Sequence, residues 1–314
     1  SLFSCFIFVG CSNESYSPEY GVMTISQEQT QAWVRNFNPL APGANARWPS
    51  VAGIYEPLFI YNSMTSKTVP WLGTTYQWKE ENKVLIIETR DNVKWSDGRP
   101  FSAYDVEFTF HLKKDFPALD GYGNWKYLSS VTAIDSNHVQ FEFSRIYVPG
   151  FEVLAGQPIV AKHIWSKVEN PLQFQNENPV GTGPFTEVTL FRSQVWELSK
   201  NPNYWQEGKP KIEKLRFPAF ISNEAATLAL INGEVDWSGN FIPAIDRIFV
   251  DKDPKHNKYW FPKTGGSIFL YLNTTISPFD DIELRKAISM SIDRDLINKV
   301  AMYNYTEPAH QTAL

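Results

Sequence analysis

The chain contains 314 residues, enough for about two domains with sizeable hydrophobic cores. Hydrophobic residues make up 43% and charged residues 20%, which excludes a disordered chain, a collagen and a coiled coil. The net charge of −5 argues against a general affinity for nucleic acids or other polyanions. Aromatic residues reach 15%, so large flat apolar surfaces are available for cores or for a stacking site.

The N-terminal segment has the composition of the end of a secretory leader followed by a tether. Residues 1–10 carry no charge and are mostly apolar, and a polar run follows Cys11. The apolar stretch is too short to span a bilayer. The run Phe8-Val9-Gly10-Cys11 resembles the bacterial lipobox, with Phe8 in place of the preferred Leu, which implies a signal peptide cleaved before Cys11 and lipidation of that cysteine. The alternative is a buried strand in which Cys5 and Cys11 are ordinary cysteines.

From residue 21 to about 180, short strand patterns surround one clear helix. Ser102, followed by Asp105 three residues later, is typical of a capping box and predicts a helix over 103–114. Its apolar side chains are expected on one face: Ala103, Tyr104, Val106, Phe108, Phe110 and Leu112. Strand patterns at 22–25, 84–87 and 139–143, with a proline-rich loop at 35–50, complete this part.

The next segment returns to strands and adds a second helix. A turn at 181–184 is expected to open a strand at Phe185. Asn223 fits the N-cap of a helix that runs to Leu230. Gly233 then fits the left-handed position that closes the helix.

The C-terminal part combines one strand pattern with two helices. The strand is expected over 267–272 and the helices over 281–300. Aspartates stand at both helix starts, with Asp280 or Asp281 before the first and Asp293 before the second. Strands mixed with helices along the whole chain predict an α/β or α+β protein.

No pattern of residue types indicates catalysis or a metal site. The five histidines lie far apart, without the spacing that places two on one helix face, and two cysteines cannot form a cysteine metal cage or a disulfide-rich scaffold. Asp105 with Glu107 and Asp280 with Asp281 are interpreted as helix-surface and helix-cap residues rather than as the facing carboxylates of a glycosidase. We therefore expect no enzyme activity, no cofactor and no metal.

Four motifs, in order along the chain, resemble family 5 of the bacterial extracellular solute-binding proteins, which serve ABC importers. They are the runs 92–106, 178–185, 201–205 and 273–294. A narrower set of runs is similar to the branch that binds chito-oligosaccharides and, in part, to its relatives that bind cello- and manno-oligosaccharides. These runs are 34–39, 55–58, 162–167, 176–179, 232–237, 253–256 and 259–260.

The resemblance implies a fold and a division of the chain. The fold is an α/β, two-lobed periplasmic-binding-protein fold of type II, in its large three-subdomain form, with the second lobe incomplete. The gene product is expected to continue beyond both ends of this chain. The implied parts are a signal end and tether at 1–20, a core subdomain of the first lobe at 21–52 and 180–275, an inserted subdomain at 53–179, and the start of the second lobe at 276–314.

The resemblance also implies which residues line the ligand cleft. A sugar site needs aromatic rings for stacking and planar polar groups for hydroxyls. The candidate ligand-binding residues are Arg35, Asn36, Asn38, Asn223, Trp237, Ser238, Asn240 and Phe241. The alternatives are a structural turn for the loop at 35–38, core packing for Trp237 and a helix cap for Asn223. Core packing is expected for Trp95, Trp125, Trp165 and Trp205.

These expectations combine into one functional hypothesis. The chain resembles a substrate-binding lipoprotein of an ABC importer, held in the periplasm or at the outer face of the cytoplasmic membrane. It is expected to be a monomer that captures a chitobiose- or cellobiose-like oligosaccharide between two lobes and delivers it to permease subunits. The main alternative keeps the fold and binds oligopeptides or dipeptides. A liganded form that docks on a membrane sensor kinase is a further alternative.

Overall fold

The structure of the chain is a computed structural model that describes residues 21–43, 50, 52–62, 64–260 and 268–308. The chain divides into two compact units, which are Ser1–Asn62 with Lys67–Asn240 and Ser63–Ser66 with Phe241–Leu314. The expected leader, its lipidation site Cys11 and the tether lie outside the described residues. The subdomain limits expected from the sequence stay predictions.

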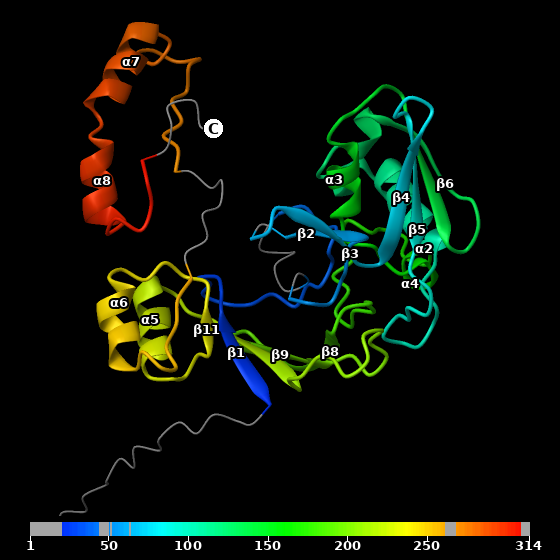
Figure 1. Cartoon of the computed structure of the whole chain (residues 1–314), viewed down its shortest axis with the longest axis horizontal. Coiled ribbons are helices and arrows are strands. Elements are labelled where there is room, and N and C mark those ends of the chain that lie inside the picture. Colours follow the sequence, from blue (N-terminus) through cyan, green and yellow to red (C-terminus); the bar gives the residue numbers. More distant parts are fainter. Residues whose placement is uncertain (1–20, 44–49, 51, 63, 261–267, 309–314) are drawn as a thin grey trace, which may run out of the picture. The chain divides into compact units, whose positions relative to one another are not determined.

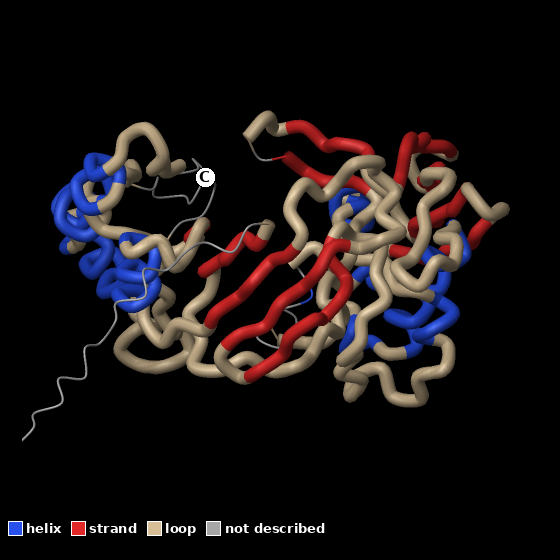
Figure 2. The backbone as a smooth tube through the Cα atoms, turned by 90° about the horizontal axis from the view of Figure 1, so that it is seen from below, coloured by secondary structure: helices blue, strands red, loops and turns tan. Residues whose placement is uncertain are grey.

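A five-stranded sheet in the first unit joins segments that are far apart in the sequence. Its strands are β1 (Val22–Ser26), β8 (Phe185–Arg192), β9 (Val195–Lys200), β10 (Lys214–Pro218) and β11 (Trp237–Ser238). The strand order is β11-β1-β10-β9-β8, and strands of this sheet run side by side in Figure 2. β1 is parallel to both β10 and β11, whereas β9 is antiparallel to its two neighbours. The strands predicted at 22–25 and from Phe185 are confirmed.

Aromatic side chains form the core against this sheet. The rings of Trp196 and Phe217 stack with centroids 4.1 Å apart, and Trp33 and Phe37 both meet the Trp196 ring edge-on. Phe37 and Trp196 are completely buried. Each such ring removes roughly 150–250 Å² from water, so this packing fixes the loop after β1 against β9 and β10.

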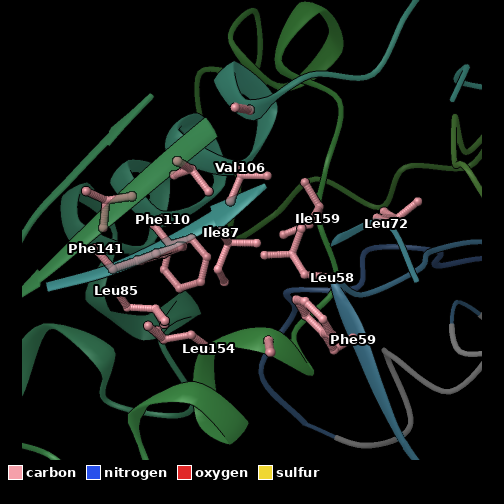
Figure 3. Close-up of a cluster of buried hydrophobic side chains, with 14 of the residues drawn as sticks. Leu58, Phe59, Leu72, Leu85, Ile87, Val106, Phe110, Phe141, Leu154 and Ile159 are labelled. Carbon is pink, nitrogen blue, oxygen red and sulfur yellow. The ribbon is translucent and has the colours of Figure 1, made fainter. Parts of the chain in front are cut away.

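A second, four-stranded antiparallel sheet has the order β4-β5-β7-β6. Its strands are β4 (Gly73–Lys79), β5 (Val84–Thr89), β6 (Leu128–Ala133) and β7 (His138–Phe143). Helix α2 (Ala103–Asp115) packs against β6 and β7 (Figure 1). Figure 3 shows Phe110 of α2 among Leu85, Ile87 and Phe141, and the rings of Phe110 and Phe141 lie 5.1 Å apart. The predicted strands at 84–87 and 139–143 are confirmed.

Helix α2 begins as its capping box predicts. The backbone N–H of Ser102 donates to Asp105 Oδ2 at 2.9 Å. The predicted apolar face is right for Ala103, Val106 and Phe110, which are fully buried, but wrong for Tyr104, whose side chain is 44% exposed. One residue along a helix turns the side chain by about 100°, so Tyr104 lies beside the buried face rather than on it.

Shorter elements complete the first unit. They are the hairpin β2 (Phe59–Asn62) and β3 (Lys67–Pro70), the helices α3 (Gly150–Ala155), α4 (Lys162–Trp165) and α5 (Asn223–Ile231), and the 3₁₀ turns η2 (Pro117–Leu119) and η3 (Asn124–Lys126). The N-cap of α5 is Ser222, whose side chain accepts from the Ala225 N–H at 3.2 Å. The predicted cap at Asn223 is therefore wrong by one residue, because Ser222 has the extended backbone that a cap requires. The left-handed Gly233, with φ +78°, is confirmed.

The second unit contains four helical elements among its described residues. They are α6 (Ile245–Ile248), η4 (Val250–Lys252), α7 (Ile282–Ser291) and α8 (Arg294–Ala301). Asp281 caps α7 and Asp293 caps α8, each accepting a backbone N–H at 2.8 Å, which confirms both predicted helices.

The strand predicted at 267–272 is not formed in the described part of that range. Residues 268–271 are exposed and pair with no strand. An extended segment becomes a strand only when a neighbouring strand pairs with its backbone, and hydrophobicity alone cannot supply that partner. Across the described ranges, none of the helices combines the length and the apolar character needed to cross a bilayer.

Candidate functional site

The carboxyl ends of three parallel strands meet at one edge of the five-stranded sheet. Ile25 and Ser26 at the end of β1 lie opposite Trp237 and Ser238 of β11. On the other side, β1 runs parallel to β10, and a parallel bridge beyond the strand ends joins Gln29 to Phe220. In open sheets with parallel strands, ligands bind outside the carboxyl ends of the strands. This edge is the candidate site.

A small polar cluster stands at this edge. The Asn240 amide nitrogen donates to Ser26 Oγ at 3.0 Å, and the Asn240 backbone N–H faces Ser238 Oγ at 3.3 Å. Ser26 is buried, whereas Ser238 and Asn240 are partly exposed. Within the described residues, the side-chain oxygen of Asn240 accepts no hydrogen bond. The cluster therefore offers an acceptor and a hydroxyl to a polar, uncharged ligand group.

Trp237 provides the apolar half of the site. Its side chain is 44% exposed. Gly239 explains its placement, because a Cβ at that position would lie 3.1 Å from the indole Cη2 and 3.1 Å from Gln27 Cγ. The indole thus lies close to the backbone of Gly239 while part of its surface stays open to solvent. An exposed indole beside amide and hydroxyl groups can stack on a flat ligand surface.

Two acidic residues flank the cluster. Asp236 is bound to the sheet, since its Oδ2 accepts the Thr24 N–H at 2.7 Å and its own N–H donates to the Thr24 carbonyl at 2.9 Å. Glu28 lies two residues beyond the end of β1, and partial burial raises the pKa of its carboxyl.

The loop at 35–38 is held mostly by internal contacts. The Arg35 guanidinium donates to the Glu177 carbonyl at 3.2 Å and to Asn178 Oδ1 at 3.1 Å. Asn38 is completely buried: its amide donates to two backbone carbonyls at 3.0 and 2.9 Å, and its oxygen accepts the Leu40 N–H at 2.9 Å. Asn36 Oδ1 accepts the Asn38 N–H at 3.0 Å. These contacts favour the structural-turn alternative for Asn38, whereas ligand roles for Arg35 and Asn36 stay predictions.

The remaining candidates are placed less closely. Asn223 is the first residue of α5 and is partly exposed. Phe241 is partly exposed and is the first residue of the second unit after Asn240. Of the tryptophans expected to pack, Trp95 and Trp165 are buried, while Trp125 and Trp205 are partly buried against the core of the second sheet.

Glu56 is a buried carboxylate that the sequence analysis missed. Its Oε1 accepts Trp71 Nε1–H at 2.7 Å and the Tyr204 hydroxyl at 3.0 Å, and its Oε2 accepts Trp205 Nε1–H at 3.0 Å. Burial raises the pKa of Glu56, and these hydrogen bonds oppose that shift. Its donors come from segments about 15 and 150 residues away, so no local pattern could have indicated the contact.

The carboxylates considered for chemistry have structural roles. Asp105 accepts the Lys162 N–H at 2.9 Å in addition to its capping bond, and Asp281 caps α7. In the part of the chain that the structure describes, no group of three or more histidine, cysteine, aspartate or glutamate side chains could hold a metal ion.

The mixed sheets and the parallel strands define an α/β protein whose candidate ligand site lies at the strand ends. Residues 67–314 match the family "Bacterial extracellular solute-binding proteins, family 5 Middle". The chain belongs to this family, as its motifs predicted. The family is described by solute binding rather than by catalysis.

Curated relatives extend the match. The chain is 26% identical over 299 residues to the nickel-binding periplasmic protein of Escherichia coli K12, covering 90% of this chain and 55% of that one. It is also 26% identical to the glutathione-binding protein GsiB of Escherichia coli O1:K1, covering 81% of this chain and 49% of that one. A putative ABC transporter peptide-binding protein of Brucella ovis is 25% identical over 88% of this chain and 52% of its own. The chain therefore spans about half the length of these relatives.

Solved structures share the fold. A mannohexaose-bound periplasmic oligopeptide-binding protein of Thermotoga maritima superposes with a TM-score of 0.79 at 29% identity, covering 94% of this chain and 56% of that one. NikZ of Campylobacter jejuni, in complex with Ni(L-His), superposes with a TM-score of 0.74 at 21% identity, covering 93% of this chain and 58% of that one. The predicted α/β class is confirmed. The oligosaccharide branch is not supported, since the names of the curated relatives point to nickel, glutathione and peptides.

Proposed function

We propose that the full protein is the substrate-binding component of an ABC importer and that its ligand is a short peptide or a peptide-like molecule. The observation that carries the proposal is the carboxyl edge of the parallel strands, where an exposed indole stands beside hydroxyl and amide groups. Membership of the solute-binding family and the named relatives support it.

The chemistry of the site fits backbone amides. A peptide presents N–H donors, carbonyl acceptors and flat amide planes. The open oxygen of Asn240 can accept an N–H, the hydroxyl of Ser238 can donate to a carbonyl, and the Trp237 ring can cover an apolar side chain or an amide plane. None of these contacts requires a charged ligand, so neutral parts of a peptide are the groups that we assign to this edge.

An oligosaccharide is the second candidate. It is favoured by one specific observation, the mannohexaose bound to the Thermotoga maritima protein that is 29% identical to this chain. The exposed Trp237 also suits a pyranose face. The same edge would then bind hydroxyls in place of amides.

The cellular setting is part of the proposal. We assign capture outside the cytoplasmic membrane, lipid anchoring at Cys11, and delivery to permease subunits. Two lobes would close around the ligand. Ligand binding would thus shift the population of the protein toward the closed form, which the permease recognises. Monomeric behaviour and docking on a sensor kinase stay predictions.

Isothermal titration of the full-length protein tests the proposal. The panel contains di- to pentapeptides, glutathione, chitobiose, cellobiose, mannobiose and the nickel–histidine chelate. Saturable binding of peptides or glutathione alone supports the main proposal. Binding of one disaccharide alone replaces it with the second candidate. If no ligand in the panel binds, both the peptide proposal and the oligosaccharide alternative are contradicted.

A further inference from the structure

Lys113 is a buried cation far along the chain from the candidate ligand site. It stands in the last turn of α2, and its side chain is only 2% exposed. Its ammonium donates to Gln157 Oε1 at 2.5 Å and lies 5.0 Å from the centre of the Phe110 ring. Within the described residues it forms no ion pair and no other hydrogen bond. An ammonium has three donors, so this buried group has more donors than hydrogen-bond acceptors.

The surroundings of Lys113 are fixed by a closed polar network. Gln157 Nε2 donates to Asn124 Oδ1 at 2.8 Å and to the Val153 carbonyl at 2.6 Å. Asn124 in turn donates to Gln157 Oε1 at 3.1 Å and to Asp120 Oδ1 at 2.6 Å. Gln157 and Asn124 are both buried. The two amide groups are therefore satisfied within this network, which includes the Val153 carbonyl and Asp120, and within the described residues no carboxylate contacts the Lys113 ammonium.

A cavity of about 240 Å³ adjoins this lysine. At roughly 30 Å³ per molecule it has room for about eight waters, or for a small organic molecule. The described residues that line it include no carboxylate: they are Lys113, Tyr122, Pro158, Leu119, Ala118, Gly121 and the stretch 39–43. The lining is thus mostly small and apolar, with one cation and one exposed phenol.

The charge balance of the region favours an anion in that cavity. Asp120 is the acidic group near Lys113, but its oxygens already accept from the Asn124 amide and from the Trp125 N–H. Lys114, the neighbouring cation, lies over the Trp125 ring at 4.4 Å. Burial lowers the pKa of Lys113 to about 8, and Asp120 only partly opposes this shift. A buried ammonium without a contacting carboxylate is costly, and a bound anion would reduce that cost.

We propose that the cavity beside Lys113 is a second binding site, for a small organic carboxylate whose charged end contacts the Lys113 ammonium and whose apolar part fills the proline- and alanine-lined space. The site belongs to the first unit and is independent of the ligand proposed for the strand edge. Its assignment rests on the buried cation and the adjoining cavity together.

Isothermal titration of the full-length protein with benzoate at pH 6.5 tests this site. Benzamide, which has the same shape without the charge, is the matched probe. Benzoate should bind saturably and at least about tenfold more tightly than benzamide, because a hydrogen bond to a charged group is strong in a buried place. Lys113→Met keeps the length and the packing of the side chain and should weaken benzoate binding at least about tenfold.

Two further variants keep the test decisive. A Cβ on Gly121 would meet nothing within 4 Å, so Gly121→Leu can narrow the cavity without touching Lys113 and should also weaken benzoate binding. Trp237→Ala should leave benzoate binding unchanged, which separates this site from the strand edge. The proposal is overturned if neither Lys113→Met nor Gly121→Leu weakens benzoate binding. It is also overturned if benzoate binds no more tightly than benzamide. If Lys113→Met fails to fold, the result for Gly121→Leu decides.

Discussion

Gly183 lies directly against the backbone of Gly53. A Cβ at Gly183 would overlap the Gly53 carbonyl oxygen, and the Gly183 N–H donates to the neighbouring Ile54 carbonyl at 2.9 Å. This close approach joins the start of β8 to the segment before β2. Gly183, the second glycine of the 181–184 turn, is thus required by the packing of two backbones.

Gly183→Ala should therefore be strongly destabilising. The overlap is with backbone, which cannot swing away as a side chain could, so we expect a loss of about 3 kcal/mol or more of unfolding free energy. Gly121→Ala is the control, because its Cβ has open space and its φ is not positive. Urea unfolding curves measure both variants, and equal midpoints for the two would contradict the close approach.

The Glu56 cluster predicts a pH-dependent stability. Burial raises the pKa of Glu56 in the folded state, so its favourable contribution is complete below the ordinary carboxyl pKa and is lost as the pH rises through the raised one. Glu56→Gln removes this titration and replaces one of the two acceptor oxygens with an NH2 group, which then faces a donor of Trp71, Tyr204 or Trp205. We expect Glu56→Gln to be destabilised by about 1–3 kcal/mol in acid, with a smaller difference at neutral pH. Denaturant titrations of both proteins from pH 4 to pH 8 test this, and a difference that grows with pH would contradict it.

Asn38 and Asn36 should differ sharply in their effect on stability. Asn38→Ala leaves the Pro171 and Phe174 carbonyls and the Leu40 N–H without their partner, which should cost about 2–4 kcal/mol. Asn36→Ala loses one partly exposed hydrogen bond and should cost about 1 kcal/mol or less. Thermal unfolding distinguishes the two, and equal, small losses would indicate that Asn38 has no structural role.

The cap of α5 gives a further paired test. Ser222→Ala should cost about 1 kcal/mol because the Ala225 N–H loses its acceptor. Asn223→Ala, one residue later, should cost less, since alanine is favourable inside a helix. Chemical denaturation measures both, and a larger loss at Asn223 would restore it as the cap.

Local signals in the sequence predicted the helices best. Three helix starts carry such a signal: the pair Ser102 and Asp105, and the caps Asp281 and Asp293. In each, an aspartate side chain accepts a backbone N–H group, so the presence of a helix and the place where it begins could be inferred together. The error at Ser222 arose because two adjacent polar residues can both cap, and only the backbone conformation decides between them.

Contacts between segments that are far apart in the chain could not be predicted from the sequence. The Glu56 cluster and the Lys113 cavity join side chains that are far apart in the chain, and the pairing of Ser26 with Asn240 crosses 214 residues. Strand patterns at 22–25 and 84–87 were recognisable, but their register and partners were not. Trp237 could be singled out as an aromatic residue, while the close approach of its indole to Gly239 depends on how the chain folds after β11.

The central claim, that ligand binds at the carboxyl edge of the parallel strands, is tested most directly by the affinity of Trp237→Ala. The matched control is Tyr104→Ala, because Tyr104 is also 44% exposed but lies on α2, away from that edge. Dissociation constants are measured by isothermal titration of the full-length protein with its best ligand from the peptide and sugar panel. The account predicts that Trp237→Ala weakens binding about 10- to 30-fold while Tyr104→Ala leaves it unchanged. An unchanged affinity for Trp237→Ala, with the variant folded, would contradict it.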